Sequence, residues 1–292
     1  MESPKYIVVP CFTHKMDPIR SLWASINSGK KEVSLLALPL LQIKKLDSFR
    51  NWVPPRGGNW EKNGENGAII LISSQTTAEC LESLPEESLK ALKRCKISVF
   101  GKKTALALEK KGYSVCYEEN VSGLEELISR VATKTDHLVY IGAKERAVDP
   151  AITLEKLGLN HLKVTTVDAY ETLNVSSLDE HEGTEQRKRA EEVIDEKKNL
   201  LNSTQLQEIQ KARNLLTEKD VHTKIISLFS SPSAVRALRS FAPPFFGTKQ
   251  IAIGQTTASE LKRLGYTPSV CKNPSIEELF KSAISEFRHV KK

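Results

Sequence analysis

Short apolar runs alternate with segments of helical periodicity along most of the chain. Eight of these runs are rich in Ile and Val, which predicts buried strands. The predicted strands are 6–10, 33–38, 68–72, 97–100, 138–141, 164–167, 225–229 and 251–253. Helical patterns lie between them, as in 104–111, 123–131, 233–241 and 257–264. Alternating strands and helices are typical of βαβ units, so we expect an α/β fold with parallel sheets.

One of these patterns occurs twice in the chain. Residues 101–113 align without a gap on residues 254–266, and six of the thirteen positions are identical. Upstream of each copy, Ile72-Ser-Ser-Gln-Thr76 matches Phe229-Ser-Ser-Pro-Ser233. The copies lie about 155 residues apart, whereas repeats of solenoid proteins have periods of roughly 20–50 residues. The repeat therefore predicts two similar, duplicated α/β domains.

The segment 178–220 interrupts the second copy. It carries eight basic and eleven acidic side chains, a net charge of −3, and contains no Pro. This composition predicts one or two helices that face solvent. A charged, solvated insertion is the default interpretation and a partner-binding arm is the alternative. We expect that residues 180–219 could be deleted with activity largely intact.

The charge of the rest of the chain indicates an anionic partner. The whole chain carries +7, so the residues outside 178–220 carry +10. Such an excess is typical of proteins that bind nucleic acid, anionic lipid or a polyacidic small molecule. The basic residues form no continuous block and aromatic residues make up only 6%, which argues against nucleic acid. No run approaches the roughly 18–20 apolar residues of a membrane span.

The cysteines and known catalytic motifs narrow the chemistry further. Five cysteines without a C-x-x-C pair argue against a disulfide framework or a zinc site. Cys11 and Cys116 are expected to pack as small apolar groups. The N-terminus has no signal-peptide pattern, so we expect a reduced, cytoplasmic protein without metal. The chain also lacks the G-x-x-x-x-G-K-[ST], G-x-G-x-x-G and G-x-S-x-G motifs, and its six histidines are dispersed.

The repeated unit is a strand that ends in Gly, followed by Thr and a helix. Free backbone amides at a helix start attract anions, and ligands of parallel sheets bind beyond the carboxyl ends of strands. The predicted binding residues are Ser73, Ser74, Gly101, Lys102, Thr104, Gly142, Ser230, Ser231, Ser233, Gly254, Thr256 and Thr257. The alternative is that these Ser and Thr residues only cap helices.

Tyr170 is the candidate acid. It follows the predicted strand 164–167, where the pattern of one domain gives way to that of the other. A phenol at such a crossover can donate a hydrogen bond into a cleft, and the alternative is an aromatic ring that packs the hinge.

Taken together, these residues resemble the uroporphyrinogen-III synthase family. The resemblance rests on Phe229–Val235, Ile251–Ala258 followed by Leu261 and Gly265-Tyr266, and Pro274–Leu279. Looser counterparts in the first half are Leu38-Pro39-Leu40, Ile72–Gln75, Gly101–Ala105 and Val167–Glu171. The order and spacing of these motifs extend over nearly the whole chain apart from 178–220.

The resemblance implies two α/β domains joined by two strand-like linkers, one domain being 1–40 with 173–292 and the other 41–172. It implies hydroxymethylbilane as substrate, a linear tetrapyrrole with eight carboxylates, which matches the expected polyacidic partner. The resemblance also implies that the substrate loses water, passes through a spiro intermediate and closes with ring D inverted. This reaction needs no metal or organic cofactor. The tyrosine that matches Tyr170 is the family's usual candidate acid.

Two further points remain open from the sequence. A monomer is expected, and the substrate could be handed over by the preceding pathway enzyme. The alternative function is a two-domain sensor that binds a small polyanion without turnover, since a catalytically inactive relative would have almost the same sequence.

Overall fold

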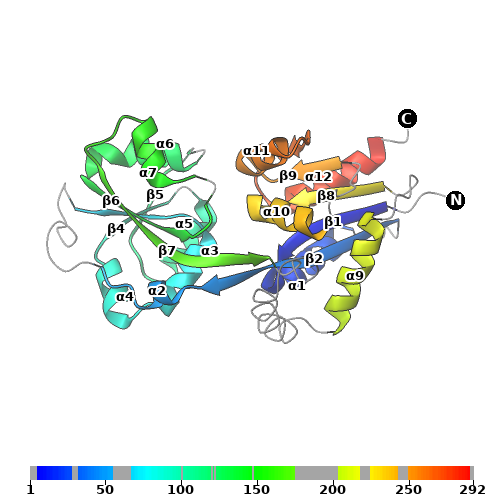
Figure 1. Cartoon of the computed structure of the whole chain (residues 1–292), viewed down its shortest axis with the longest axis horizontal. Coiled ribbons are helices and arrows are strands. Elements are labelled where there is room, and N and C mark those ends of the chain that lie inside the picture. The colour runs from blue at the N-terminus through cyan, green and yellow to red at the C-terminus, as the bar shows by residue number, and fades with distance from the viewer. Residues whose placement is uncertain are drawn as a thin grey trace, which may run out of the picture. The chain divides into compact units, whose positions relative to one another are not determined.

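The structure is a computed structural model, which describes residues 5–27, 32–54, 67–99, 101–119, 121, 123–146, 148–174, 203–217, 224–242 and 249–289. The chain forms two compact units (Figure 1). Unit 1 consists of Met1–Gln42 and Leu173–Lys292, and unit 2 consists of Ile43–Thr172. The strands β2 (Val33–Lys45) and β7 (Lys163–Asn174) each begin in one unit and end in the other.

Unit 1 is built on parallel strands in the order β10-β9-β8-β1-β2. Besides β2, these are β1 (Lys5–Phe12), β8 (Lys224–Phe229), β9 (Lys249–Ala252) and β10 (Ser269–Val270). Its helices are η1 (Thr13–Lys15), α1 (Met16–Ile26), α9 (Ser203–Thr217), α10 (Pro232–Phe241), α11 (Gln255–Arg263) and α12 (Ile276–His289). One core lies under α9, α10 and α11, and a second, around Trp23 and Phe280, lies under α1 and α12. The strands are thus buried on both faces, as their apolar sequences predict.

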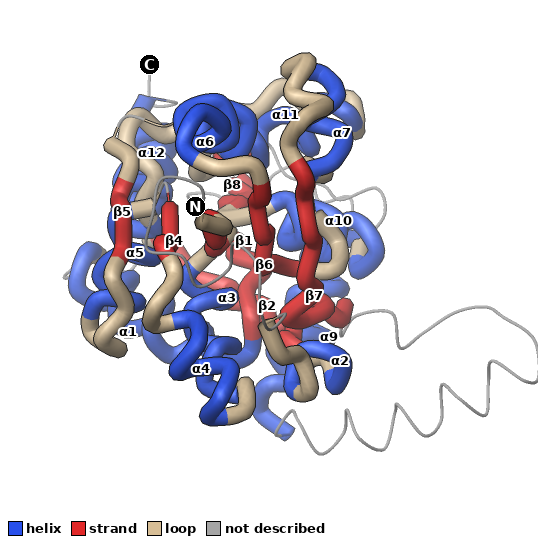
Figure 2. Tube along the Cα trace, turned by 90° about the vertical axis from the view of Figure 1, so that its left-hand side faces the viewer, coloured by secondary structure: helices blue, strands red, loops and turns tan. Residues whose placement is uncertain are grey.

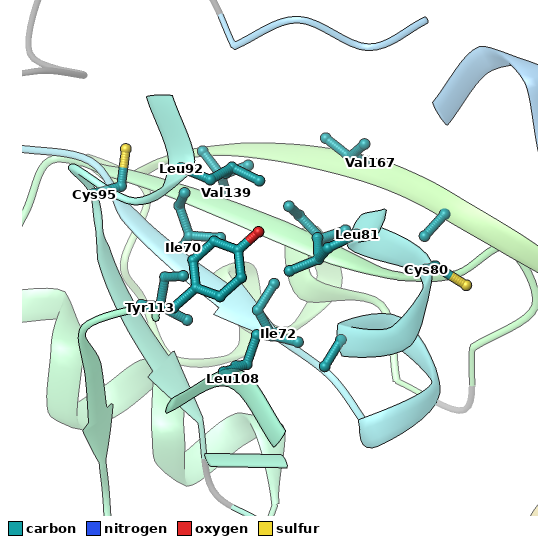
Figure 3. Close-up of a cluster of buried hydrophobic side chains, with 14 of the residues drawn as sticks. Ile70, Ile72, Cys80, Leu81, Leu92, Cys95, Leu108, Tyr113, Val139 and Val167 are labelled. Atoms are coloured by element: carbon teal, nitrogen blue, oxygen red, sulfur yellow. The ribbon is translucent and has the colours of Figure 1, made fainter. Parts of the chain in front are cut away.

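Unit 2 has parallel strands in the order β5-β4-β3-β6-β7. Figure 2 shows β5, β4, β6 and β7 from left to right. Besides β7, these are β3 (Ile69–Ile72), β4 (Lys96–Val99), β5 (Val115–Tyr117) and β6 (His137–Ala143). Its helices are α2 (Asp47–Arg50), α3 (Gln75–Cys80), η2 (Leu81–Ser83), α4 (Glu86–Leu92), α5 (Lys102–Glu109), α6 (Leu124–Val131), η3 (Ala132–Lys134) and α7 (Pro150–Lys156). Figure 3 shows part of the core on the α3–α5 face, with Tyr113 beside Ile72 and Leu108, and a second core lies under α6 and α7.

The two units have the same spatial order of strands. Strands β8, β9 and β10 occupy in unit 1 the positions that β3, β4 and β5 occupy in unit 2, and β1 and β2 correspond to β6 and β7. The pairs β1–β2 and β6–β7 both have a register shift at the equivalent point. It lies between Pro10 and Phe12 on β1 and between Gly142 and Ala143 on β6. The order in which the strands follow one another along the chain differs between the units, because unit 1 consists of two separate segments of the sequence.

The structure confirms the α/β class, and each of the eight predicted runs contains a strand. Phe100, at the end of one run, lies outside the described residues. The sequence analysis missed β5 and β10, which have three and two residues at the outer edges of the sheets. Segments this short show no measurable period, so pairing with a neighbouring strand decides their conformation.

The prediction of a helix in the insertion is confirmed for residues 203–217, but the prediction that this helix faces solvent is wrong for one of its sides. Helix α9 packs on the face formed by β1 and β2, where Ala212 and Leu216 are fully buried and Ile209 is half-buried. The rest of the predicted insertion lies outside the described residues. The prediction that Cys116 packs as an apolar group is also wrong, since Cys116 is exposed whereas Cys11 is buried.

Candidate functional site

The strand order of unit 2 creates one position that is suited to ligand binding. Strand β3 lies between β4 and β6, because the chain runs from β3 outward to β4 and β5 and then returns to β6 on the other side of β3. In open α/β sheets, ligands bind at this switch point, beyond the carboxyl ends of the strands. Ser73 follows β3 there, and its backbone N–H donates to the carbonyl of Ile141 on β6 at 3.2 Å. The predicted residues Ser73 and Gly142 are therefore neighbours at the switch point of unit 2.

Three hydroxyl groups meet where the chain passes from β3 into α3. Ser74 caps α3, because its Oγ accepts a hydrogen bond from the backbone N–H of Thr77 at 3.2 Å. The Oγ1 of Thr77 lies 2.8 Å from Ser73 Oγ and 3.0 Å from Ser74 Oγ. Thr77 has no exposed surface, whereas both serines are half-buried. The cap thus places the Thr77 hydroxyl between the two serines.

The phenol of Tyr170 joins this group of hydroxyls. Tyr170 is 8% exposed and packs in the core on the α3–α5 face. Its hydroxyl hydrogen-bonds with Ser74 and Thr77, but burial outweighs these bonds and raises the pKa of Tyr170. A buried phenol with a raised pKa is uncharged at neutral pH, so it carries a proton that it can donate.

A second tyrosine reaches the same hydroxyls from the opposite face of the sheet. Tyr140 on β6 is 6% exposed and hydrogen-bonds with Ser73, and burial raises the pKa of its phenol. A Cβ atom on Gly142 would lie 2.6 Å from Cε1 of the Tyr140 ring and 2.9 Å from Ser73 Oγ. Only glycine therefore leaves room for this ring beside Ser73.

Two charged side chains lie next to Tyr140. The guanidinium carbon of Arg146 is 5.5 Å from the centroid of the Tyr140 ring, and Arg146 is paired with Asp168 of β7. Asp168 lies opposite Gly142 in the β6–β7 register. The sequence analysis identified neither Tyr140 nor Thr77. The only sequence signals were the short spacing from Tyr140 to Gly142 and the position of Thr77 three residues after Ser74.

The repeated Gly–Thr motifs form the N-termini of α5 and α11. Gly101 and Gly254 are the N-cap residues, and neither helix has a side-chain cap. Thr104 and Thr257 are buried in the first turns, whereas Lys102 and Thr256 are exposed. A Cβ atom on Gly101 would lie 3.3 Å from Thr104 Oγ1, so this hydroxyl is close to the start of α5. These ends leave backbone amides available to an anion.

In unit 1 the serine pair recurs without the tyrosines. Ser231 caps α10 by accepting from the backbone N–H of Ala234 at 3.2 Å, and its Oγ lies 2.9 Å from that of Ser233. Ser230 precedes it at the end of β8. These residues correspond in sequence and position to the serines before α3 in unit 2. The structure thus brings Ser73, Ser74 and Gly142 together in unit 2, and Ser231 and Ser233 together in unit 1. The Gly–Thr motifs lie at the separate starts of α5 and α11.

Two lysines share one carboxylate next to Tyr170. The Nζ atoms of Lys44 and Lys144 lie 3.1 and 3.6 Å from the carboxylate oxygens of Glu171. The carboxylate is mostly buried, while both lysine side chains are more than half exposed. This cluster follows Tyr170 in sequence, and neither lysine is among the groups that shift the pKa of Tyr170.

Within the described part of the chain, no group of His, Cys, Asp and Glu side chains is arranged to hold a metal ion. None of the described helices is both long enough and apolar enough to cross a membrane. The described site itself consists of hydroxyls, phenols, backbone amides and cationic side chains.

Comparison with known proteins identifies the family. The family model of uroporphyrinogen-III synthase HemD matches residues 30–281. The chain belongs to the uroporphyrinogen-III synthase family. This is an enzyme family of tetrapyrrole biosynthesis with a cyclising lyase activity. No significant match was found among curated proteins.

Solved uroporphyrinogen-III synthase structures have a similar fold. The enzyme from Helicobacter pylori aligns with a TM-score of 0.52 and 19% identity, over 97% of this chain and 99% of that one. A mutant uroporphyrinogen III synthase from the extremely thermophilic bacterium Thermus thermophilus aligns with a TM-score of 0.52 and 14% identity, over the same shares. At these identities the likeness extends to the α/β fold, and the site residues must be argued from this chain.

Proposed function

We propose that this chain closes hydroxymethylbilane to uroporphyrinogen III, with inversion of ring D and loss of one water. The observation that carries the proposal is the buried, hydrogen-bonded phenol of Tyr170 in a chain whose residues 30–281 match this family. A sensor that only binds a polyanion needs no such proton donor.

In the first step the substrate supplies its own electrophile. The C–O bond of the hydroxymethyl group breaks, the pyrrole nitrogen provides the electron pair, and Tyr170 protonates the leaving oxygen. Water departs, a cationic azafulvene forms and Tyr170 becomes a phenolate. Although the raised pKa makes Tyr170 a weaker acid, water is a far weaker acid still, so the proton transfer to hydroxide remains favourable.

The later steps return the proton. The substituted carbon of ring D attacks the azafulvene and gives the spiro intermediate, which fragments and closes again with ring D inverted. The ring carbon that forms the last bond loses its hydrogen as a proton, and the phenolate recovers it. The substrate thus loses one water and no net proton.

The rest of the protein holds the chain for closure. We propose that the two units are duplicated copies, 1–40 with 173–292 and 41–172, linked through β2 and β7. The N-termini of α5, α10 and α11, with Lys102, Thr256 and the serines of both units, bind substrate carboxylates. Holding reacting atoms together can contribute several kcal/mol, up to roughly 7–11 in favourable cases.

We further propose that the protein works as a cytoplasmic monomer without metal or organic cofactor. Activity after exhaustive chelation and gel filtration would test these points. If the preceding pathway enzyme hands over hydroxymethylbilane directly, neither dilution nor a reagent that traps free hydroxymethylbilane should interrupt the transfer.

The decisive experiment offers the protein hydroxymethylbilane generated enzymatically, followed by oxidation and separation of the porphyrin isomers. We expect the isomer with ring D inverted, in proportion to the enzyme present. The control without protein reports the spontaneous closure, which gives the isomer without inversion. Binding of the substrate with only the spontaneous isomer formed would instead establish the sensor function.

A further inference from the structure

Tyr140 and Tyr170 are joined by an unbroken series of hydroxyl groups. Tyr140 hydrogen-bonds with Ser73, Ser73 with Thr77 at 2.8 Å, and Thr77 with Tyr170. Each hydroxyl can accept one hydrogen bond and donate the next. Both phenols and Thr77 are almost fully buried. The series therefore connects the proposed acid to a second proton donor through Thr77, which is fully buried, and Ser73, which is half-buried.

Unit 1 shows that the fold does not require this series. The strand registers and the repeated serine motif place Val9 where unit 2 has Tyr140, Ala234 where it has Thr77, and Leu41 where it has Tyr170. The serine cap and the register shift are present in both units. The side chains at these three positions of unit 1 are thus apolar and carry no hydroxyl group, although both units have the serine cap and the register shift.

The two ends of the series have different electrostatic surroundings. Arg146 lies beside the Tyr140 ring, and its charge favours the phenolate form of Tyr140 against burial, Asp149 and Asp168. Among the described residues, no cation acts on Tyr170 in the same way; its neighbours are Cys80, Tyr140 and the hydroxyls of Ser74 and Thr77. A negative charge that moves from Tyr170 to Tyr140 therefore comes to lie beside a cation.

From these observations we propose that Tyr140 is a positioning residue that acts through Tyr170, as the far end of a proton relay. This inference rests on the proposed function. When Tyr170 gives its proton to the departing hydroxide, Thr77 donates to Tyr170, Ser73 to Thr77 and Tyr140 to Ser73. The phenolate then stands at Tyr140 beside Arg146. The reverse shift returns the proton to Tyr140 when the last ring carbon loses its hydrogen, so the cycle balances without another acid.

The test compares single-turnover rates on enzymatically generated hydroxymethylbilane. Tyr140→Phe removes only the terminal hydroxyl, and Thr77→Val interrupts the middle of the series with little change in shape. We expect each variant to lower the rate about 10- to 100-fold, part of what general acid catalysis contributes, with KM unchanged. The double variant should be no slower than the slower single one, because both changes break one relay. Thr77→Ser should restore the rate, and the solvent deuterium isotope effect should fall in both damaged variants.

The matched control is Tyr113→Phe, which removes a buried phenol from the core on the α3–α5 face without touching the relay (Figure 3). Rates of Tyr140→Phe and Thr77→Val equal to that of this control would overturn the relay while the proposed function stood. Additive losses in the double variant would overturn it as well, since they indicate two independent effects. Failure of the proposed function is distinguishable, because the unmodified protein would then form no inverted isomer.

Discussion

At the scale of single residues, the site depends on hydroxyl groups rather than charges. Tyr170, Thr77 and Ser74 hydrogen-bond with one another in a nearly closed environment. A buried hydroxyl without a partner costs about 1–3 kcal/mol, so these partners keep the phenol buried at little cost. Burial in turn preserves its proton at neutral pH. The same contacts therefore serve stability and the proposed proton transfer.

Tyr170→Phe separates these two roles, because the ring stays in place and only the donor is lost. We expect turnover to fall about 10- to 1000-fold. The free energy of unfolding should fall by only about 0.5–1.5 kcal/mol, the contribution of one hydrogen bond. Rates and isomer ratios measured against enzyme concentration would show a slow enzyme whose product is still mainly inverted, since geometry decides the isomer. A fully active Phe variant, with Tyr170→Ala destabilised, would assign Tyr170 to packing alone.

The thiols provide a second test at this scale, because thiolates rather than thiols react with iodoacetamide. Burial raises the pKa of Cys11 to about 12, and Cys80, Cys95 and Cys271 are also buried. Partial burial and Glu118 also raise the pKa of Cys116, but its thiol is exposed. At pH 8 we therefore expect slow alkylation of one cysteine per folded chain, Cys116, and faster alkylation of all five after denaturation. Mass spectrometry measures the labelling. Labelling of the folded chain that persists in Cys116→Ser would show that another thiol opens to solvent.

At the scale of secondary-structure elements, α9 is part of the core of unit 1. Its apolar residues Ile209, Ala212 and Leu216 recur at intervals of three and four, which places them on one side of the helix. That side belongs to the core that also contains Val8 of β1 and Leu38, Leu40 and Leu41 of β2. The charged composition of the insertion describes the outer side of α9 and its flanks, but not this contact.

Leu216→Ala should therefore destabilise the protein by about 2–5 kcal/mol, the usual cost of a buried leucine. Deletion of 203–217 should give insoluble or poorly folded protein. Urea denaturation measures the first effect, and Gln207→Ala, at an exposed position on the same helix, is the matched control. Equal stability of the Leu216 and Gln207 variants would show that α9 does not contribute to the core in solution.

The starts of α5 and α11 give a second prediction for elements. Thr104 and Thr257 occupy equivalent first-turn positions beside uncapped glycines. We expect Thr104→Ala and Thr257→Ala each to lower kcat/KM about 10-fold or more, since a charge-assisted hydrogen bond contributes about 1.5–3 kcal/mol, whereas Thr→Ser should have little effect. Thermal melting run in parallel identifies the alternative. If kcat/KM stays constant and only the melting temperature falls, these threonines are packing residues.

At the scale of the whole molecule, each hydrophobic core lies within one of the two units. Two of the four hydrophobic cores contain only residues of unit 1, and the other two contain only residues of unit 2. A domain with its own core can in principle fold alone. Unit 2 is continuous in sequence, whereas unit 1 is completed only after the chain has passed through unit 2.

We therefore expect the fragment 43–172 to fold by itself, with one cooperative thermal transition measured by circular dichroism. It should form no uroporphyrinogen III, because the proposed carboxylate sites of unit 1 are missing. A fragment of unit 2 with Ile70→Asp in its core is the control for cooperativity. A broad, non-cooperative melt of the unaltered fragment would show that unit 2 requires unit 1 to fold.

The sequence by itself determined the α/β class, the positions of eight strands, the family and the candidate residues Tyr170, Ser73 and Ser74. It could do so because strand periodicity, glycine turns and serine caps are local properties that a few neighbouring residues decide. The sequence repeat further predicted that the serine and Gly–Thr loops occur in both halves of the chain. The domain boundaries and the binding roles of these loops stay predictions.

Only the tertiary structure decided which of these residues meet. Tyr140 lies 67 residues after Ser73 in sequence, and the parallel pairing of β3 with β6 brings it to that serine. The register shift after Gly142 pairs Ala143 with Tyr170 and so brings the second phenol to the same edge of the sheet. Likewise, the burial of Leu216 depends on where α9 docks. Such contacts depend on pairing and packing between distant segments, which no local pattern of polar and apolar residues specifies.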